Sequence, residues 1–141
     1  MDPEALLAAS AALMKRARTA TLATIDAGGF PRPVTMAVVA VEGADTVWFA
    51  TDRSSRKAAH IAACPKSGVA FAEESDSVTL VGTATVVDTP EQKRRLWQDW
   101  FIRFFPEGPD DKEYVLLCFK AQEALVYIGG DFQSISLKGR S

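Results

Sequence analysis

The sequence is poor in the residues that most metal and catalytic sites require. His60 is the only histidine, which excludes a histidine-rich metal site, and no Ser–His–Asp triad is apparent. Cys64 and Cys118 lack the spacing of a metal or redox pair, so we expect reduced thiols and a cytoplasmic protein. No GxGxxG sequence and no phosphate-loop motif occurs. We therefore expect no metal site.

Charge and hydropathy exclude further classes of protein. The net charge is −2 at pH 7, so we expect no nucleic-acid or anionic-membrane surface. No apolar run has the length of a transmembrane helix. Of the 141 residues, 48% are apolar and 24% are charged, which predicts one globular domain over residues 1–141.

The segments that are present predict a mainly β fold. Six runs have strand composition, and short turns join most of them. These runs cover residues 19–26, 31–41, 46–51, 68–72, 77–88 and 113–128. Predicted helices cover residues 3–16, 54–64 and 90–104, the last beginning with a capping box at 89–92. A parallel sheet would need a helix between most strands, so the pattern favours a six-stranded antiparallel barrel with flanking helices.

Three single features add detail to this prediction. Gly82, inside a strand, predicts a bulge or a close approach of two backbones. The polar tail from Asp131 is expected to be loosely held. His60, on a helix among alanines, is expected to be a half-exposed surface residue.

The predicted helix 90–104 is unusually aromatic. Core packing accounts for Leu96 and Phe101. Trp97 and Trp100 exceed what one small helix needs for its core, so we expect part of this surface to face a partner subunit or a ligand.

The stretch 46–57 joins a strand to a basic helix start. Ser54 and Ser55 are typical N-cap residues, and Arg56 and Lys57 follow them. Helix N-termini bind anions through free N–H groups, and basic side chains add opposite charge. The joint therefore predicts a phosphate site. The alternative is a capped surface helix whose basic side chains are only solvated.

Arg32 strengthens the phosphate interpretation. It lies near the start of the strand that follows the Gly28-Gly29 turn, directly upstream of the joint. A lone arginine is usually a surface charge, but here it would supply a second arm of a phosphate clamp. A chain with few catalytic side chains and a phosphate clamp is typical of a protein whose chemistry belongs to a cofactor.

In order and spacing, these residues resemble the pyridoxamine 5′-phosphate oxidase-like flavoproteins, and within them the general stress protein 26 branch. The resemblance extends from about Thr19 to Tyr127. It is carried by Leu22-Ala23-Thr24-Ile25-Asp26, Pro31-Arg32-Pro33-Val34, Trp48-Phe49-Ala50-Thr51-Asp52, Ser55-Arg56-Lys57, Val81-Gly82-Thr83-Ala84 and the loop 105–111.

The resemblance implies a split β-barrel homodimer that holds FMN at the subunit interface. Around the FMN phosphate it implies Arg32, Ser55, Arg56 and Lys57. Around the flavin ring and ribityl chain it implies Val34, Thr35, Met36, Ala50 and Thr51. From the second subunit, it implies that Trp97, Trp100 and the loop 105–108 close the site.

The sequence also departs from the true oxidases. Ala37 stands where they carry a lysine, and Ser77 stands where they carry a glutamine that contacts the flavin. Tyr127 stands where the stress-protein branch often has a tryptophan. The C-terminal substrate-binding segment of the true oxidases is missing. We therefore expect no useful oxidation of pyridoxamine 5′-phosphate.

These observations favour an FMN-dependent oxidoreductase that acts on a small-molecule redox substrate. Three alternatives remain open at this point. The first is a flavin-binding stress protein without turnover, the second is a relative that uses the deazaflavin F420, and the third is a barrel without a ligand. FAD in place of FMN is also open, and the sequence identifies no catalytic residue.

Overall fold

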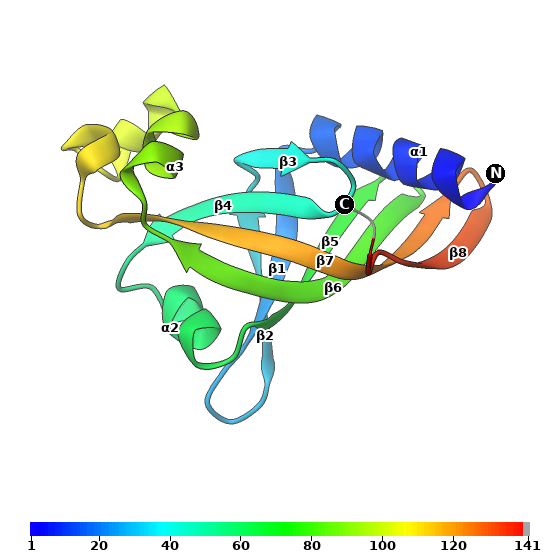
Figure 1. Ribbon diagram of the computed structural model, residues 1–141, viewed down its shortest axis with the longest axis horizontal. Coiled ribbons are helices and arrows are strands. Elements are labelled where there is room, and N and C mark those ends of the chain that lie inside the picture. The colour runs from blue at the N-terminus through cyan, green and yellow to red at the C-terminus, as the bar shows by residue number, and fades with distance from the viewer. Residues whose placement is uncertain (140–141) are drawn as a thin grey trace.

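An antiparallel sheet of eight strands, curled on itself, makes up most of the molecule (Figure 1). The computed structural model describes residues 1–139. The strands are β1 (Thr19–Ile25), β2 (Pro31–Ala37), β3 (Ala40–Glu42), β4 (Thr46–Asp52), β5 (Lys66–Glu73), β6 (Asp76–Val87), β7 (Tyr114–Ile128) and β8 (Asp131–Ser136). The α-helices are α1 (Pro3–Arg16), α2 (Arg56–Ala63) and α3 (Pro90–Arg95), and two 3-10 helices follow, η1 (Asp99–Arg103) and η2 (Gly108–Asp110).

The link between β2 and β3 brings the two ends of the strand order together. That order is β2-β1-β5-β6-β7-β4-β3, and β8 pairs with the C-terminal half of β7. The N–H of Val38 donates to the carbonyl oxygen of Arg18, just before β1, at 2.9 Å. The N–H of Val39 donates to the carbonyl oxygen of Trp48, in β4, also at 2.9 Å. The predicted split antiparallel barrel with flanking helices is confirmed.

The strand count is eight rather than the predicted six, for two reasons. The predicted strand 31–41 is two strands, because the chain changes partner at Val38 and Val39 and pairs with β4 afterwards. The expectation of a loosely held tail is wrong, because residues 131–136 form β8 against β7. Ile135 and Leu137 are buried, and the residues between and beside them are exposed. The alternation places Ile135 and Leu137 on the inner face, and their burial anchors the tail to the sheet.

The predicted helix 90–104 is correct only as far as Arg95. Leu96 and Phe101 are both buried, as expected. They are five residues apart, a spacing that does not place two side chains on one face of an α-helix. The chain therefore leaves the helix after Arg95 and continues as η1. The capping box is also wrong, because the Thr89 side chain makes no capping hydrogen bond.

Two hydrophobic clusters lie on opposite faces of β4 and β7. Val47, Phe49, Leu117 and Phe119 belong to the main core inside the barrel. Trp48 and Tyr114 face the other way, into a second cluster with Leu96, Phe101 and Phe105. The aromatic segment after α3 therefore covers the outside of the sheet. None of the helices among residues 1–139 combines the length and apolar character needed to cross a membrane.

A buried lysine fixes α3 to the end of β7. Lys93 Nζ donates to Asp88 Oδ1 at 3.1 Å and to the carbonyl oxygen of Asp111 at 3.2 Å. It also lies 5.3 Å from the centre of the Tyr114 ring. The Tyr114 hydroxyl donates to the carbonyl oxygen of Lys93 at 2.9 Å, and burial raises the pKa of Tyr114 to about 12.

Gly82 marks a bulge between β6 and β7, as predicted. The pairing register shifts between Val81, opposite Glu123, and Gly82, opposite Ala121. A Cβ at Gly82 would overlap the carbonyl oxygen of Lys120 and lie 2.8 Å from Ala121 Cα. Only a residue without a side chain fits at this crossing.

Candidate functional site

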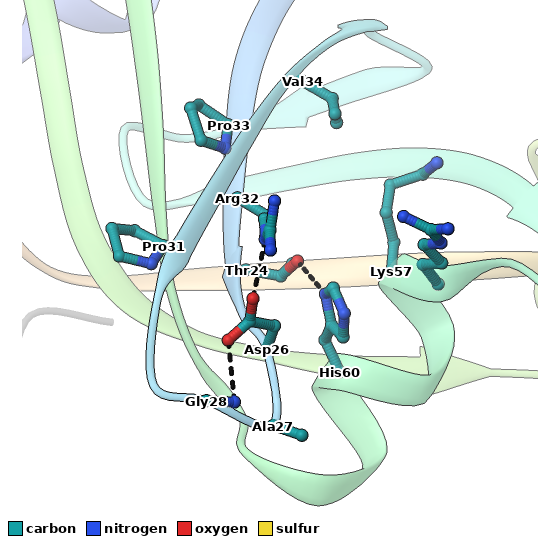
Figure 2. A pocket seen from close by; sticks show the side chains of 11 residues that line it. Thr24, Asp26, Ala27, Gly28, Pro31, Arg32, Pro33, Val34, Lys57 and His60 are labelled. Carbon is teal, nitrogen blue, oxygen red and sulfur yellow. Dashed lines mark hydrogen bonds and ion pairs between the residues drawn. The ribbon is translucent and has the colours of Figure 1, made fainter.

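A hollow of about 870 Å³ lies between the β1–β2 hairpin and α2 (Figure 2). Its hairpin side consists of Thr24, Asp26, Ala27, Gly28, Pro31, Arg32, Pro33 and Val34. Its helix side consists of Arg56, Lys57 and His60. A space of this size is typical of sites for small molecules and cofactors.

The inner face of β2 runs from the hydrophobic core at one end of the strand to the hollow at the other. Arg32, Val34 and Met36 pair with Thr24, Leu22 and Ala20 of β1. Opposite residues of an antiparallel pair point to the same face, so these three side chains of β2 share the face on which β1 buries its own. Met36 packs on the core, whereas Val34 is 39% exposed and the Arg32 side chain is 62% exposed. The strand thus leaves the core along its length and forms one wall of the hollow.

α2 presents its N-terminus and one side to the same space. Ser55 is the N-cap residue, and its Oγ accepts the N–H of Ala58 at 3.2 Å. The N–H groups in the first turn of a helix have no acceptor within the helix. Arg56 and Lys57 are the first two residues of α2, and His60 follows at the spacing of one turn.

The charge pattern at the start of α2 is opposite to the one that stabilises a helix. The first turn has no acidic residue, although helix N-termini favour negative charge. Among residues 1–139, neither Arg56 nor Lys57 forms an ion pair, whereas Arg16, Arg53 and Arg94 do. Two unpaired cations at the positive end of a helix favour the binding of an anion at this position.

Asp26 and Arg32 form the polar part of the opposite wall. Arg32 Nε donates to Asp26 Oδ2 at 2.7 Å. Asp26 Oδ1 accepts the N–H groups of Gly28 and Phe30, each at 2.9 Å. The hydrogen bond from Arg32, together with these N–H groups, lowers the pKa of Asp26 below its ordinary value. Three cations and one carboxylate therefore line the hollow, a net charge that matches a phosphate dianion.

Thr24 and His60 connect the two walls. Thr24 Oγ1 and His60 Nδ1 are 2.9 Å apart, and Figure 2 shows the two side chains pointing toward each other. Thr24 is buried and His60 is half-buried. This contact holds α2 against β1, and with it the spacing between the hairpin and the basic helix start.

The structure brings together part of the predicted site. Arg32, Val34, Arg56 and Lys57 line the hollow, and Ser55 caps the helix beside them. The other six predicted residues lie outside its lining. Thr35 is exposed on the other face of β2, Met36 and Ala50 are half-buried, Thr51 is buried in β4 and Trp97 is half-buried in the second cluster. Trp100, the last of the six, is 44% exposed on η1.

The sequence interpretation missed Thr24, Asp26 and His60. His60 is half-exposed, as expected, but it lines the hollow. Two signals pointed to these residues. The spacing of Arg56, Lys57 and His60 by three and four residues places them on one side of a helix. A hairpin with its turn at 26–30 pairs Thr24 with Arg32, which places Asp26 near the arginine.

The outer edge of β2 is suited to a ligand rather than to another strand. Proline cannot donate a hydrogen bond to β1, so Pro33 must be a non-hydrogen-bonded partner of Ala23. Every second residue then directs its backbone groups away from β1, and these include Pro33 and Thr35. Because Pro33 has no N–H, the edge is a poor template for a further strand, while the N–H of Thr35 remains directed outward.

Residues 8–134 match the family model described as pyridoxamine 5′-phosphate oxidase like. A comparison with curated proteins found no match.

Several solved structures share the fold. A protein related to general stress protein 26 from Clostridium acetobutylicum superposes with a TM-score of 0.83 at 24% identity, covering 95% of this chain and 96% of that one. General stress protein 26 from Bacillus anthracis gives a TM-score of 0.75 at 22% identity, covering 96% and 100%. A heme-binding protein from Mycobacterium smegmatis gives 0.68 at 19% identity, covering 93% of this chain and 55% of that one.

Proposed function

The chain belongs to the pyridoxamine 5′-phosphate oxidase-like family, and on that premise we propose that it binds FMN with the phosphate in the hollow between β2 and α2 and acts as an FMN-dependent oxidoreductase. The observation that carries the proposal is the pair of unpaired cations, Arg56 and Lys57, at the start of α2. A phosphate there would satisfy the helix N–H groups and both side chains at once.

The remaining residues fit the same ligand. Arg32 faces α2 from the opposite wall and would bind the phosphate from the other side. Val34 and the outward N–H of Thr35 would contact the flavin ring along the exposed edge of β2, and Met36, Ala50 and Thr51 would support it from the strands behind. Bound FMN supplies hydride or electron transfer. The side chains of this chain bind the phosphate, orient the ring and limit the access of water.

We also propose a homodimer in which the partner covers the ring. β2 is exposed on both faces for most of its length. Trp100, Ile102 and Phe104 expose between 44% and 63% of their surface around η1. Such surfaces are typical of interfaces with aromatic centres. Light scattering at micromolar concentration should give a dimer, and a monomer that binds FMN tightly would contradict this part of the proposal.

The absorption spectrum of freshly purified protein separates the possible cofactors. Flavin, the deazaflavin F420 and heme each absorb at characteristic wavelengths, and heme is included because a relative of the same fold binds it. FMN and FAD are distinguished by releasing the cofactor and separating it by chromatography. Reduction by NADH or NADPH in the presence of a second acceptor then distinguishes an oxidoreductase from a flavin-binding protein without turnover.

A single substitution tests the phosphate site. Lys57→Ala removes one of the charged hydrogen-bond donors, which contribute about 1.5–3 kcal/mol each. FMN binding to the apoprotein should therefore weaken by roughly ten- to a hundredfold. Riboflavin, which has no phosphate, should bind as it does to the wild type.

The matched control is Lys15→Ala, since Lys15 is an exposed lysine near the end of α1. It should leave the affinity for both compounds unchanged. If Lys57→Ala binds FMN as well as the wild type, or weakens riboflavin equally, the hollow is not the phosphate site.

A further inference from the structure

We propose that Asp26 is a positioning residue of the phosphate site, which orders the Arg32 guanidinium before the ligand arrives. The inference rests on the proposed function, because it assigns to Asp26 a role in binding the same phosphate group. Asp26 would not touch the phosphate itself. It would act through Arg32, by holding one edge of the guanidinium and leaving the other donors free.

The geometry makes Asp26 the fixed member of the pair. Its Oδ1 accepts two backbone N–H groups, from Gly28 and Phe30, at 2.9 Å each. Its Oδ2 accepts from Arg32 Nε at 2.7 Å. The Asp26 side chain is 15% exposed, whereas that of Arg32 is 62% exposed. An arginine this exposed would otherwise sample many rotamers, so the anchored carboxylate determines where its guanidinium lies.

The bond to Nε leaves the useful part of the guanidinium available. Arginine has five N–H donors in a planar fork, and a carboxylate on Nε occupies only one of them in the structure. Both terminal amino groups of Arg32 stay free to bind two oxygens of a phosphate. The Arg16–Glu73 pair differs in this respect, because Glu73 occupies both Nε and Nη2 of Arg16 and leaves fewer donors free.

Two simpler roles for Asp26 predict different results. If Asp26 were only a negative charge near an anion site, its removal would tighten FMN binding by reducing repulsion. If Asp26 only closed the hairpin turn, its removal would alter stability and would affect FMN and riboflavin equally. The positioning role alone predicts weaker FMN binding at unchanged stability and unchanged riboflavin binding.

The first variant is Asp26→Asn. Asparagine keeps an oxygen for the N–H groups of the turn and is well tolerated there, but its amide nitrogen cannot accept from Arg32 Nε. FMN should bind to the apo variant about three- to tenfold more weakly, the size expected when a long side chain must be ordered during binding. Riboflavin affinity and the melting temperature should not change.

The matched control is Glu73→Gln. Glu73 also pairs with an exposed arginine, Arg16, through Nε at 3.1 Å and Nη2 at 2.8 Å, and it lines no part of the hollow. It should leave FMN affinity unchanged. A second variant, Arg32→Lys, keeps the positive charge and leaves the turn untouched, but has no fork for both Asp26 and a phosphate. It should weaken FMN binding to a similar extent.

The double variant decides the inference. In a protein that carries Arg32→Ala, Asp26→Asn should have no further effect on FMN affinity, because Asp26 has no arginine to position. Equal losses from Asp26→Asn with and without Arg32 would overturn the inference, as would an unchanged or tighter FMN affinity of the single variant. If Asp26→Asn proves unstable, an Arg32→Lys variant that binds FMN like the wild type overturns it instead. An Arg32→Ala variant that binds FMN normally would refute the phosphate site itself, which is a separate failure.

Discussion

The crossing of β6 and β7 at Gly82 offers the sharpest test of the barrel. Replacing Gly82 by alanine places a methyl group against the backbone of β7. The new Cβ would lie 2.8 Å from Ala121 Cα and 2.9 Å from the Lys120 carbonyl carbon, and would overlap the Lys120 oxygen. These are backbone atoms of a central strand, so they cannot rotate away as the end of a side chain would.

The structure gives the size of the effect. Forcing a methyl group into a filled position typically costs about 1–3 kcal/mol. Separating the strands also weakens the neighbouring hydrogen bonds, at about 0.5–1.5 kcal/mol for each one lost. We therefore expect Gly82→Ala to reduce the free energy of unfolding by about 3–4 kcal/mol. For a domain of this size the melting temperature should fall by about 10 °C.

Gly68→Ala is the matched control in the neighbouring strand. Its Cβ would lie 3.5 Å from the Leu80 carbonyl oxygen, an ordinary contact, and Gly68 does not have a positive φ. At such a position alanine stabilises by about 0.4–1 kcal/mol, because it restricts the unfolded chain. Urea unfolding of both variants measures the difference. If Gly82→Ala lies within 1 kcal/mol of Gly68→Ala, the register of β6 on β7 is wrong.

Three further predictions concern buried groups and their partners. Lys93→Met should reduce the free energy of unfolding by about 2 kcal/mol, because it removes charged hydrogen bonds of a side chain that is only 7% exposed. Urea unfolding of the variant measures this reduction. Burial raises the pKa of Asp88, but hydrogen bonds from Arg53 and Lys93 outweigh it and hold the pKa below 3.8. The stabilisation from Asp88 is thus complete above its ordinary pKa and lost as the pH falls through the lowered value, so Lys93→Met should flatten the dependence of stability on pH below about pH 4. Cys118 is 7% exposed and burial raises its pKa, so a thiol reagent at pH 8 should label Cys64 much faster; equal rates would show that the second cluster opens readily.

Local signals in the sequence were enough to place most of the elements. Asp2 caps α1 by accepting the N–H of Ala5 at 2.7 Å, and Ser55 caps α2 in the same way. A glycine inside a strand usually marks a bulge or a close approach of two backbones, and Gly82 lies at such a bulge. In each case the residue type and its immediate neighbours determine the structure.

The errors arose where distant contacts override local preference. Residues 96–105 have helical composition, but burial of Leu96 and Phe101 against Tyr114 requires a different backbone. Val38 and Val39 belong to a long strand-like run, and their separate partners at Arg18 and Trp48 were not visible in it. In the hollow, the helix start was evident from Ser55 and its neighbours. The position of Asp26 beside Arg32 was not evident, because it depends on the register of the hairpin.

The order of the strands also has a consequence for how the chain folds. Four pairs of consecutive strands, β1–β2, β3–β4, β5–β6 and β7–β8, form hairpins. Isolated hairpins form in about 1–10 μs. The three seams that join them, β1–β5, β6–β7 and β4–β7, connect more distant parts of the chain, so their loop-closure entropy should set a folding time in the range of milliseconds to seconds. Because the bulge at Gly82 lies on the β6–β7 seam, a comparison of folding and unfolding rates at this one position would reveal whether that seam forms before or after the rate-limiting step.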